Sequence, residues 1–109
     1  MQSLPQDLKD CLDPKRAFIF SKSYCPYCEL AKLHLTKLQV PFDYAECDLI
    51  PFSEEQKQQL REMTGVFSFP NIFIGTKSIG GYDDMIKLEK EGRLKIILNE
   101  EGVTYQQLS

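Results

Sequence analysis

Several features are rare or absent in this sequence of 109 residues, and each absence argues against a class of protein. The apolar runs are only a few residues long, whereas a membrane-spanning helix needs roughly 20 apolar residues. The start of the chain, Met1–Pro5, lacks the basic and then apolar pattern of a secretory signal. No run of basic residues is present and the net charge is −3. We therefore expect neither a membrane nor a nucleic acid as a partner.

Cysteine is present, but not in the pattern of a disulfide framework. Cys25 and Cys28 lie three residues apart, and Cys11 and Cys47 are isolated. Small secreted proteins spread their cysteines to join distant loops, so this arrangement favours the reducing cytosol and predicts a cytoplasmic protein. Hydrophobic residues make up 42% of the chain and charged residues 27%, which predicts one folded globular domain rather than a disordered chain.

Predicted strands and helices alternate in the first half of the chain. Ala17–Phe20 is an apolar run of strand length, and Pro26 suits the first position of a helix. The apolar residues after this proline recur at helical spacing: Leu30, Ala31, Leu33, Leu35 and Leu38. Pro41 ends this helix, and Phe42–Cys47 reads as a second strand. Ser53 and Gln56 then form a capping-box pattern for a helix that ends at Gly65.

The second half of the chain has a different order of predicted elements. The predicted strands at residues 71–74 and 77–79 are separated only by Gly75-Thr76, a spacing that permits a hairpin. Asp83 and Asp84 then lie in the first turn of a helical region that runs to about Leu98 and is interrupted at Gly92. The order of elements predicts an α/β protein with a mixed four-stranded sheet and helices on both faces.

The Cys25–Cys28 pair lies at the start of the first long predicted helix, which favours redox chemistry. At the N-cap, the unpaired backbone N–H groups and the positive end of the helix dipole stabilise a thiolate on Cys25. Lys22 adds positive charge nearby, whereas Cys28 lies one turn inside the helix, where solvent is excluded. We therefore expect Cys25 to attack a disulfide and Cys28 to resolve the product.

A zinc site is the main alternative for such a pair. The other ligands would have to come from His34, Cys11 or Cys47, and these residues form no second pair. We expect no metal site, and we expect Cys11 and Cys47 to be inert thiols.

Separated motifs along the chain resemble one known family. Ser21–Cys28 (SKSYCPYC) is followed by Thr64-Gly65, then by Phe69–Ile74 (FPNIFI) and by Gly80–Asp84 (GGYDD). Together they resemble a glutaredoxin with a dithiol active site. The resemblance implies a thioredoxin-like fold, a monomer, and glutathione-dependent reduction of protein disulfides or of mixed disulfides with glutathione.

The resemblance covers residues 15–98. It leaves residues 1–14 as an N-terminal helical extension and residues 99–109 as a polar C-terminal tail.

The resemblance also implies a glutathione site with several parts. Phe69 precedes Pro70, which matches the family's cis-proline, and its backbone would pair with the cysteinyl part of glutathione like an added strand. The backbone of Gly81, Tyr82 and Asp83 would hold the γ-glutamyl carboxylate at a helix start, and Asp84 would accept from the ammonium.

The glycyl carboxylate would be left to Lys22, Tyr27 and Lys57. The chain departs from the family on this side, because Phe67 stands where the family often has a cation, and Lys57 stands where Gln is more usual. Tyr82 also replaces a Cys that is common in its motif. Thioredoxin itself is disfavoured, because that family has Trp before its first active-site cysteine and this chain has no Trp.

An alternative within the same family is a dimer that binds an iron–sulfur cluster through Cys25 of each chain and glutathione. Pro26 argues against this alternative, because proline beside the ligating thiol is the variant less often associated with a cluster.

Overall fold

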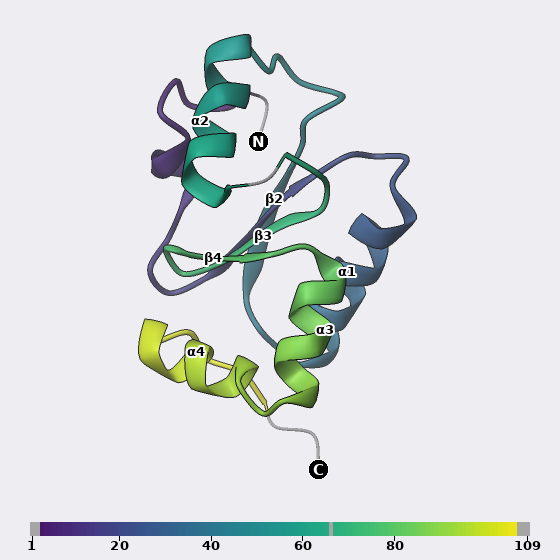
Figure 1. The fold of residues 1–109 in the computed structure, drawn as a ribbon, viewed down its shortest axis with the longest axis vertical. Helices are drawn as coiled ribbons and strands as arrows, with labels where there is room; N and C mark the ends of the chain where they lie inside the picture. Colours follow the sequence, from purple (N-terminus) through teal and green to yellow (C-terminus); the bar gives the residue numbers. More distant parts are fainter. Residues whose placement is uncertain (1–2, 66, 107–109) are drawn as a thin grey trace.

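The computed structural model describes residues 3–65 and 67–106 (Figure 1). In chain order, the elements are the 3-10 helix η1 (Leu8–Cys11), β1 (Ala17–Ser21), α1 (Pro26–Lys37), β2 (Phe42–Glu46), α2 (Glu54–Thr64), β3 (Asn71–Ile74), β4 (Lys77–Gly80), α3 (Tyr82–Lys90) and α4 (Leu94–Glu101). None of the described helices is long and apolar enough to cross a membrane.

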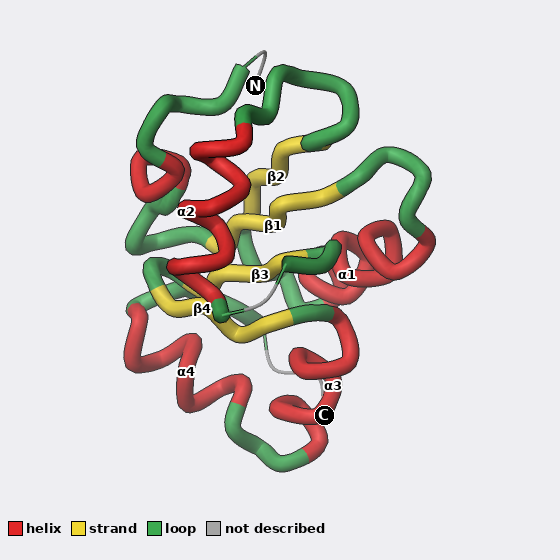
Figure 2. Tube along the Cα trace, turned by 45° about the horizontal axis from the view of Figure 1, so that its top comes forward, coloured by secondary structure: helices red, strands yellow, loops and turns green. Residues whose placement is uncertain are grey.

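The four strands form one mixed sheet in the order β2-β1-β3-β4. Figure 2 shows the strands side by side in this order. β1 runs parallel to β2 and antiparallel to β3, and β3 and β4 form an antiparallel hairpin. The parallel pair brings the carboxyl ends of β1 and β2 to the same edge of the sheet, next to the start of α1. The predicted mixed four-stranded α/β fold is confirmed.

Helices cover both faces of this sheet, because side chains alternate along the central strands. Ala17 and Ile19 of β1 join the core cluster of α1, α3 and α4, whereas Phe18 and Phe20 join the cluster that contains Leu60 of α2. The burial pattern of β1 and β3 is continuous, as expected for central strands covered on both sides. Two hydrophobic layers therefore hold the sheet in place behind the loops at its edge.

Helix α2 has the ends that its sequence predicts. The Ser53 hydroxyl accepts from the Gln56 backbone N–H at 3.0 Å, and the Gln56 side chain accepts from the Ser53 N–H at 2.8 Å. Gly65 ends the helix in the left-handed conformation, with φ of 80°. Both signals are local, so the helix bounds could be predicted from sequence.

The predicted helix is present as α1, but not all of its apolar residues belong to the core. Leu30 is 41% exposed and Leu33 is 64% exposed, so neither belongs to the core. The buried face is formed by Cys28, Ala31 and Leu35, which follow one another at helical spacing. The helix is apolar on more than one side, and the sheet covers only one of them.

The bounds of several elements also differ in detail from the prediction. The N-terminal helical stretch is limited to η1, with Leu8 fully buried, and β2 ends at Glu46 rather than Cys47. The last helix extends beyond Leu98 to Glu101, after the expected interruption at Gly92. Val103 is buried in the core behind it. The expected division of the chain into an extension, a domain and a tail stays a prediction.

Candidate active site

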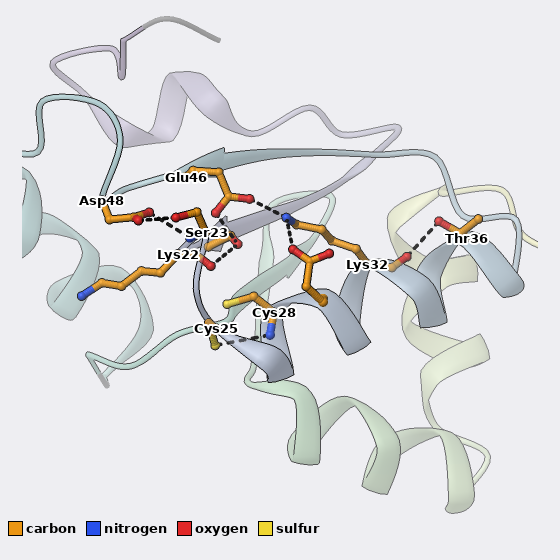
Figure 3. Close-up of polar contacts among 10 residues, drawn as sticks. Lys22, Ser23, Cys25, Cys28, Lys32, Thr36, Glu46 and Asp48 are labelled. Carbon is orange, nitrogen blue, oxygen red and sulfur yellow. Dashed lines mark hydrogen bonds and ion pairs between the residues drawn. The ribbon is translucent and has the colours of Figure 1, made fainter.

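Cys25 and Cys28 occupy the positions that the sequence predicts at the start of α1. Cys25 is the N-cap, Pro26 is the first helical residue, and the Cys28 backbone N–H donates to Cys25 Sγ at 3.4 Å (Figure 3). Cys25 is half-buried, whereas Cys28 is fully buried. Burial, reinforced by a hydrogen bond with Cys25, raises the pKa of the Cys28 thiol to about 11. The two thiols therefore differ in access to solvent.

The Phe69 backbone lies next to the Cys25 sulfur. Cys25 Sγ donates to the Phe69 carbonyl oxygen at 3.7 Å, and the Phe69–Pro70 peptide bond is cis, as predicted. Pro70 is buried, whereas Phe69 is only partly buried. The carbonyl oxygen of Phe69 therefore lies beside the sulfur at a partly exposed position.

Residues at the start of α3 lie close to this proline. A Cβ on Gly81 would be 3.4 Å from the Pro70 carbonyl oxygen, which is van der Waals contact, so the start of α3 lies directly against Pro70. The ring centroids of Tyr82 and Tyr27 are 5.9 Å apart. The structure therefore brings the predicted γ-glutamyl segment and Tyr27 together beside Pro70.

The two acidic residues in this segment have different surroundings. Asp84 accepts from the Gly81 N–H at 2.9 Å and so caps the first turn of α3. Asp83 lies in the same turn, and both side chains are exposed. Asp84 thus has a structural role in addition to its predicted contact with the ammonium of glutathione, which stays a prediction.

Lys22 and Lys57 meet at one surface hollow of about 260 Å³, which Phe52 and Phe67 also line. The Lys22 ammonium lies 4.9 Å from the centroid of the Phe69 ring, and Lys57 pairs with Glu54 at 3.1 Å. The structure therefore brings together two of the predicted cationic groups, although Lys22 precedes β2 in the chain and Lys57 follows it in α2.

Arg61 is a cation of this region that sequence reasoning missed. Its guanidinium carbon lies 4.9 Å from the centroid of the Phe67 ring. Phe67 is the residue that stands where the family often has a cation. Arg61 follows Lys57 by one turn of α2, and residues four apart share a helix face. The four-residue spacing between Lys57 and Arg61 was the sequence feature that could have indicated this second cation.

Asp48 anchors the loop before Cys25 and was also missed. Its carboxylate accepts from the Ser23 N–H at 2.9 Å and from the Ser23 hydroxyl. These hydrogen bonds, the side-chain one first, lower the pKa of Asp48. The signal was the parallel pairing of β1 and β2, which brings the residues that follow both strands to the same edge.

The residues that the zinc alternative would need, His34, Cys11 and Cys47, have other surroundings. His34 contacts Glu89 of α3, and burial raises the pKa of Cys11 to about 11 and that of Cys47 to about 12. Among the described residues, no group of three or more His, Cys, Asp or Glu side chains is arranged to hold a metal ion.

Comparisons with known proteins point to one family. The family model described as Glutaredoxin matches residues 17–79. The chain is 39% identical to a glutaredoxin of Solanum lycopersicum over 94 residues, which are 86% of this chain and 87% of the relative. It is 37% identical to glutaredoxin-C2 of Arabidopsis thaliana over 97 residues, which are 89% of this chain and 87% of the relative.

Solved structures agree with these relatives. The buckwheat glutaredoxin–glutathione complex superposes with a TM-score of 0.79 at 31% identity, covering 89% of this chain and 88% of that one. Wheat glutaredoxin superposes with a TM-score of 0.75 at 40% identity, covering 84% of this chain and 87% of that one. With its Cys25–Cys28 dithiol at a helix start beside a cis-proline, this chain belongs to the glutaredoxin family of thiol–disulfide oxidoreductases and has their thioredoxin-like fold.

Proposed function

We propose that the protein uses glutathione to reduce mixed disulfides between proteins and glutathione, and also protein disulfides. The observation that carries this proposal is the position of Cys25 Sγ, at the N-cap of α1 and 3.7 Å from the Phe69 carbonyl oxygen. A peptide that pairs with the Phe69 backbone would hold its own sulfur close to Cys25. The buckwheat relative is described as a complex with glutathione, which supports the same ligand here.

Reduction of a glutathione mixed disulfide needs only Cys25. The Cys25 thiolate attacks the glutathione sulfur, the protein thiolate leaves, and a disulfide between Cys25 and glutathione forms. A second glutathione thiolate then attacks the glutathione sulfur of this disulfide. Oxidised glutathione is released and the Cys25 thiolate is restored. Glutathione is thus a co-substrate and the source of both electrons.

Reduction of a protein disulfide needs both cysteines. Cys25 first forms a mixed disulfide with the protein, which releases one protein thiol. Cys28 then attacks Cys25 Sγ, the second protein thiol leaves, and a Cys25–Cys28 disulfide remains. Two glutathione molecules restore the dithiol. The 3.4 Å distance from the Cys28 backbone N–H to Cys25 Sγ shows how close the two residues lie.

The charges of the site suit glutathione, which has two carboxylates and one ammonium. The cations at the 260 Å³ hollow, Lys22 and Lys57, face the glycyl end in this proposal, with Arg61 close by. The start of α3 would receive the γ-glutamyl carboxylate at its backbone N–H groups, and Asp84 the ammonium.

A coupled assay with glutathione, glutathione reductase and a small glutathione mixed disulfide tests this function. We expect turnover by the unaltered protein, none by Cys25→Ser, and retained turnover by Cys28→Ser. A protein disulfide substrate should be reduced only when both cysteines are present. Activity of Cys25→Ser equal to that of the unaltered protein would contradict the proposal.

The cluster-binding alternative is tested separately. We propose a monomer, so protein purified without oxygen should elute as one and lack the visible absorption of an iron–sulfur cluster. A dimer with such absorption, lost in Cys25→Ser, would favour the alternative.

A further inference from the structure

The loop between β1 and α1 carries two residues of the proposed reaction, Lys22 and Cys25. The Cys25 backbone N–H donates to the Lys22 carbonyl oxygen at 3.1 Å, so residues 22–25 form one tight turn. Both ends of this turn contact the same residue. The Lys22 ammonium lies 4.9 Å from the centroid of the Phe69 ring, and Cys25 Sγ lies 3.7 Å from the Phe69 carbonyl oxygen. The position of the turn therefore sets where the nucleophile and the neighbouring cation lie.

Asp48 holds this turn from the end of the neighbouring strand. Its Oδ1 accepts from the Ser23 backbone N–H at 2.9 Å, and its Oδ2 accepts from the Ser23 hydroxyl. Figure 3 shows the Asp48 carboxylate facing Ser23 across the loops that follow β1 and β2. These hydrogen bonds, the side-chain one first, lower the pKa of Asp48, so the carboxylate is charged at neutral pH. A charged acceptor makes the stronger kind of hydrogen bond.

The sheet brings Asp48 to this position. In the parallel pair of β1 and β2, Ser21 is the register partner of Glu46, and the Cys47 N–H donates to the Ser21 carbonyl oxygen at 2.8 Å. Ser23 and Asp48 each follow one member of this register pair by two residues, so they leave the sheet side by side. Ser21 and Cys47 are both buried. Asp48 is thus attached to a buried part of the sheet.

The turn has little packing of its own. Its two central residues, Ser23 and Tyr24, are exposed, and Tyr24 has 70% of its surface open to solvent. Segments with few buried contacts open locally at a low cost in free energy. The position of the turn therefore depends on the hydrogen bond between its ends and on the two that Ser23 donates to Asp48.

We propose that Asp48 is a positioning residue for the reduction of glutathione mixed disulfides. Through its two hydrogen bonds to Ser23, Asp48 fixes the turn in the place where Cys25 and Lys22 meet Phe69. This inference rests on the proposed function, because the site that the turn completes is the one proposed for glutathione. Asp48 acts on the reacting sulfur through the turn.

The charge of Asp48 predicts an effect of the opposite sign. Asp48 borders the 260 Å³ hollow together with Lys22 and Lys57, where its carboxylate opposes the binding of a carboxylate of glutathione. If charge were its only role, Asp48→Ala would bind glutathione at least as well as the unaltered protein. If Asp48 positions the turn, the same variant loses activity.

The variants Asp48→Ala and Asp48→Asn separate the hydrogen bonds from the charge. Both remove the charge, but the asparagine oxygen can accept from the Ser23 N–H and its amide group can donate to the Ser23 hydroxyl oxygen. The coupled assay with glutathione and a small glutathione mixed disulfide gives kcat and KM for each variant. The rate at which iodoacetamide modifies Cys25 at pH 7 is measured in parallel, because this small reagent reports thiolate reactivity without the glutathione site.

We expect Asp48→Ala to lower kcat/KM by about tenfold, which is less than the roughly hundredfold cost of a misplacement by about 1 Å. Its alkylation rate should stay within about threefold of the unaltered protein, because Cys25 stays at the helix N-cap. Asp48→Asn should keep kcat/KM within about threefold of the unaltered protein, because both contacts with Ser23 can form.

Asp43→Ala is the matched control. Asp43 is also an exposed aspartate that accepts hydrogen bonds, but its partner is Arg16, at 2.8 Å. This variant should keep the kcat/KM of the unaltered protein. Equal kcat/KM for Asp48→Ala and Asp43→Ala would overturn the inference. So would an Asp48→Asn protein as impaired as Asp48→Ala, or a fall of the same size in turnover and in alkylation.

Substitutions of Ser23 give a second test, which holds even if Asp48→Ala does not fold. Ser23→Ala removes the hydroxyl but keeps the N–H, so it should lower kcat/KM by about threefold, the effect of one exposed hydrogen bond. Ser23→Thr keeps a hydroxyl and should restore most of the activity. Equal kcat/KM for both variants would overturn the inference. No turnover by the unaltered protein would overturn the proposed function and this inference with it, so the two failures are distinguishable.

Discussion

Cys25 and Cys28 have the same side chain but different surroundings. Cys25 is at a helix N-cap with its sulfur accepting a backbone N–H, and Cys28 is one turn further on with no exposed surface. Cys11 and Cys47 pack against the apolar cluster on the other face of the sheet. At the scale of single residues, Cys28 and Cys47 are buried and Cys11 and Cys25 are partly exposed, and burial raises the pKa of Cys11, Cys28 and Cys47.

Selective alkylation tests this difference. The raised pKa values of Cys11, Cys28 and Cys47, about 11, 11 and 12, leave only about one thiolate in ten thousand or fewer on each at pH 7. Brief treatment of the reduced protein with iodoacetamide at pH 7 should therefore modify Cys25 first, as judged by peptide mass spectrometry. Alkylation of these three thiols increases only as the pH rises toward their pKa values. Equal labelling of Cys25 and Cys47 in the folded protein would contradict this assignment.

Asp84 has a structural contact and a predicted binding role, and Asp84→Asn separates them. The asparagine oxygen can still accept from the Gly81 N–H, so the free energy of unfolding should change little. The lost charge should weaken the contact with the ammonium of glutathione by roughly 1.5 to 3 kcal/mol, raising the apparent KM about tenfold to a hundredfold. Asp83→Asn serves as the control, because Asp83 has the same charge and is exposed in the same turn, while the Gly81 N–H donates to Asp84. An unchanged KM for Asp84→Asn would leave Asp84 with the capping role alone.

Helix α1 supports the site through one buried face, and the rest of the helix is free to face solvent. Leu35 is fully buried between the sheet and the other helices of its cluster, and Leu33, two residues earlier, is 64% exposed. The exposed apolar residues near the cysteines, Tyr24, Tyr27 and Leu30, lie outside the core as well. At the scale of the element, hydrophobic spacing alone overestimates how much of α1 is core.

The pair Leu35→Ala and Leu33→Ala measures this difference. Leu35→Ala should lower the free energy of unfolding by about 2 to 5 kcal/mol, because it leaves a cavity in the core. Leu33→Ala should change it by less than about 0.5 kcal/mol, as is usual for surface positions. Urea unfolding followed by circular dichroism gives both values. A larger loss for Leu33→Ala than for Leu35→Ala would mean that α1 packs through its other face.

The whole molecule depends on contacts between its first residues and the middle of the chain. Leu8 of η1 is fully buried with Phe18 and Leu60, and its backbone N–H donates to Gln59 Oε1 at 2.8 Å. Val103 similarly belongs to the cluster that includes Leu38, and the Gln106 N–H donates to the Leu38 carbonyl oxygen at 2.7 Å. Both described ends of the chain therefore pack on the domain.

Leu8→Ala tests how much this packing stabilises the molecule. The substitution should lower the free energy of unfolding by about 2 to 5 kcal/mol, although Leu8 lies outside the segment that resembles the family. Leu49→Ala is the control, because Leu49 is 68% exposed. Thermal and urea unfolding should show one cooperative transition in both proteins. A Leu8→Ala protein as stable as the control would show that η1 is dispensable for the fold.

Local chemistry determined what could be predicted from the sequence alone. The order of strands and helices, the N-cap position of Cys25 and the capping box of α2 all depend on residues within one turn or one strand of each other. The tertiary structure decided which distant groups meet. Arg61 lies over the Phe67 ring and Asp48 holds Ser23, and neither pairing has a local pattern. Ser21 and Glu46 are 25 residues apart and meet because β1 and β2 pair in parallel in one register, which depends on the whole sheet.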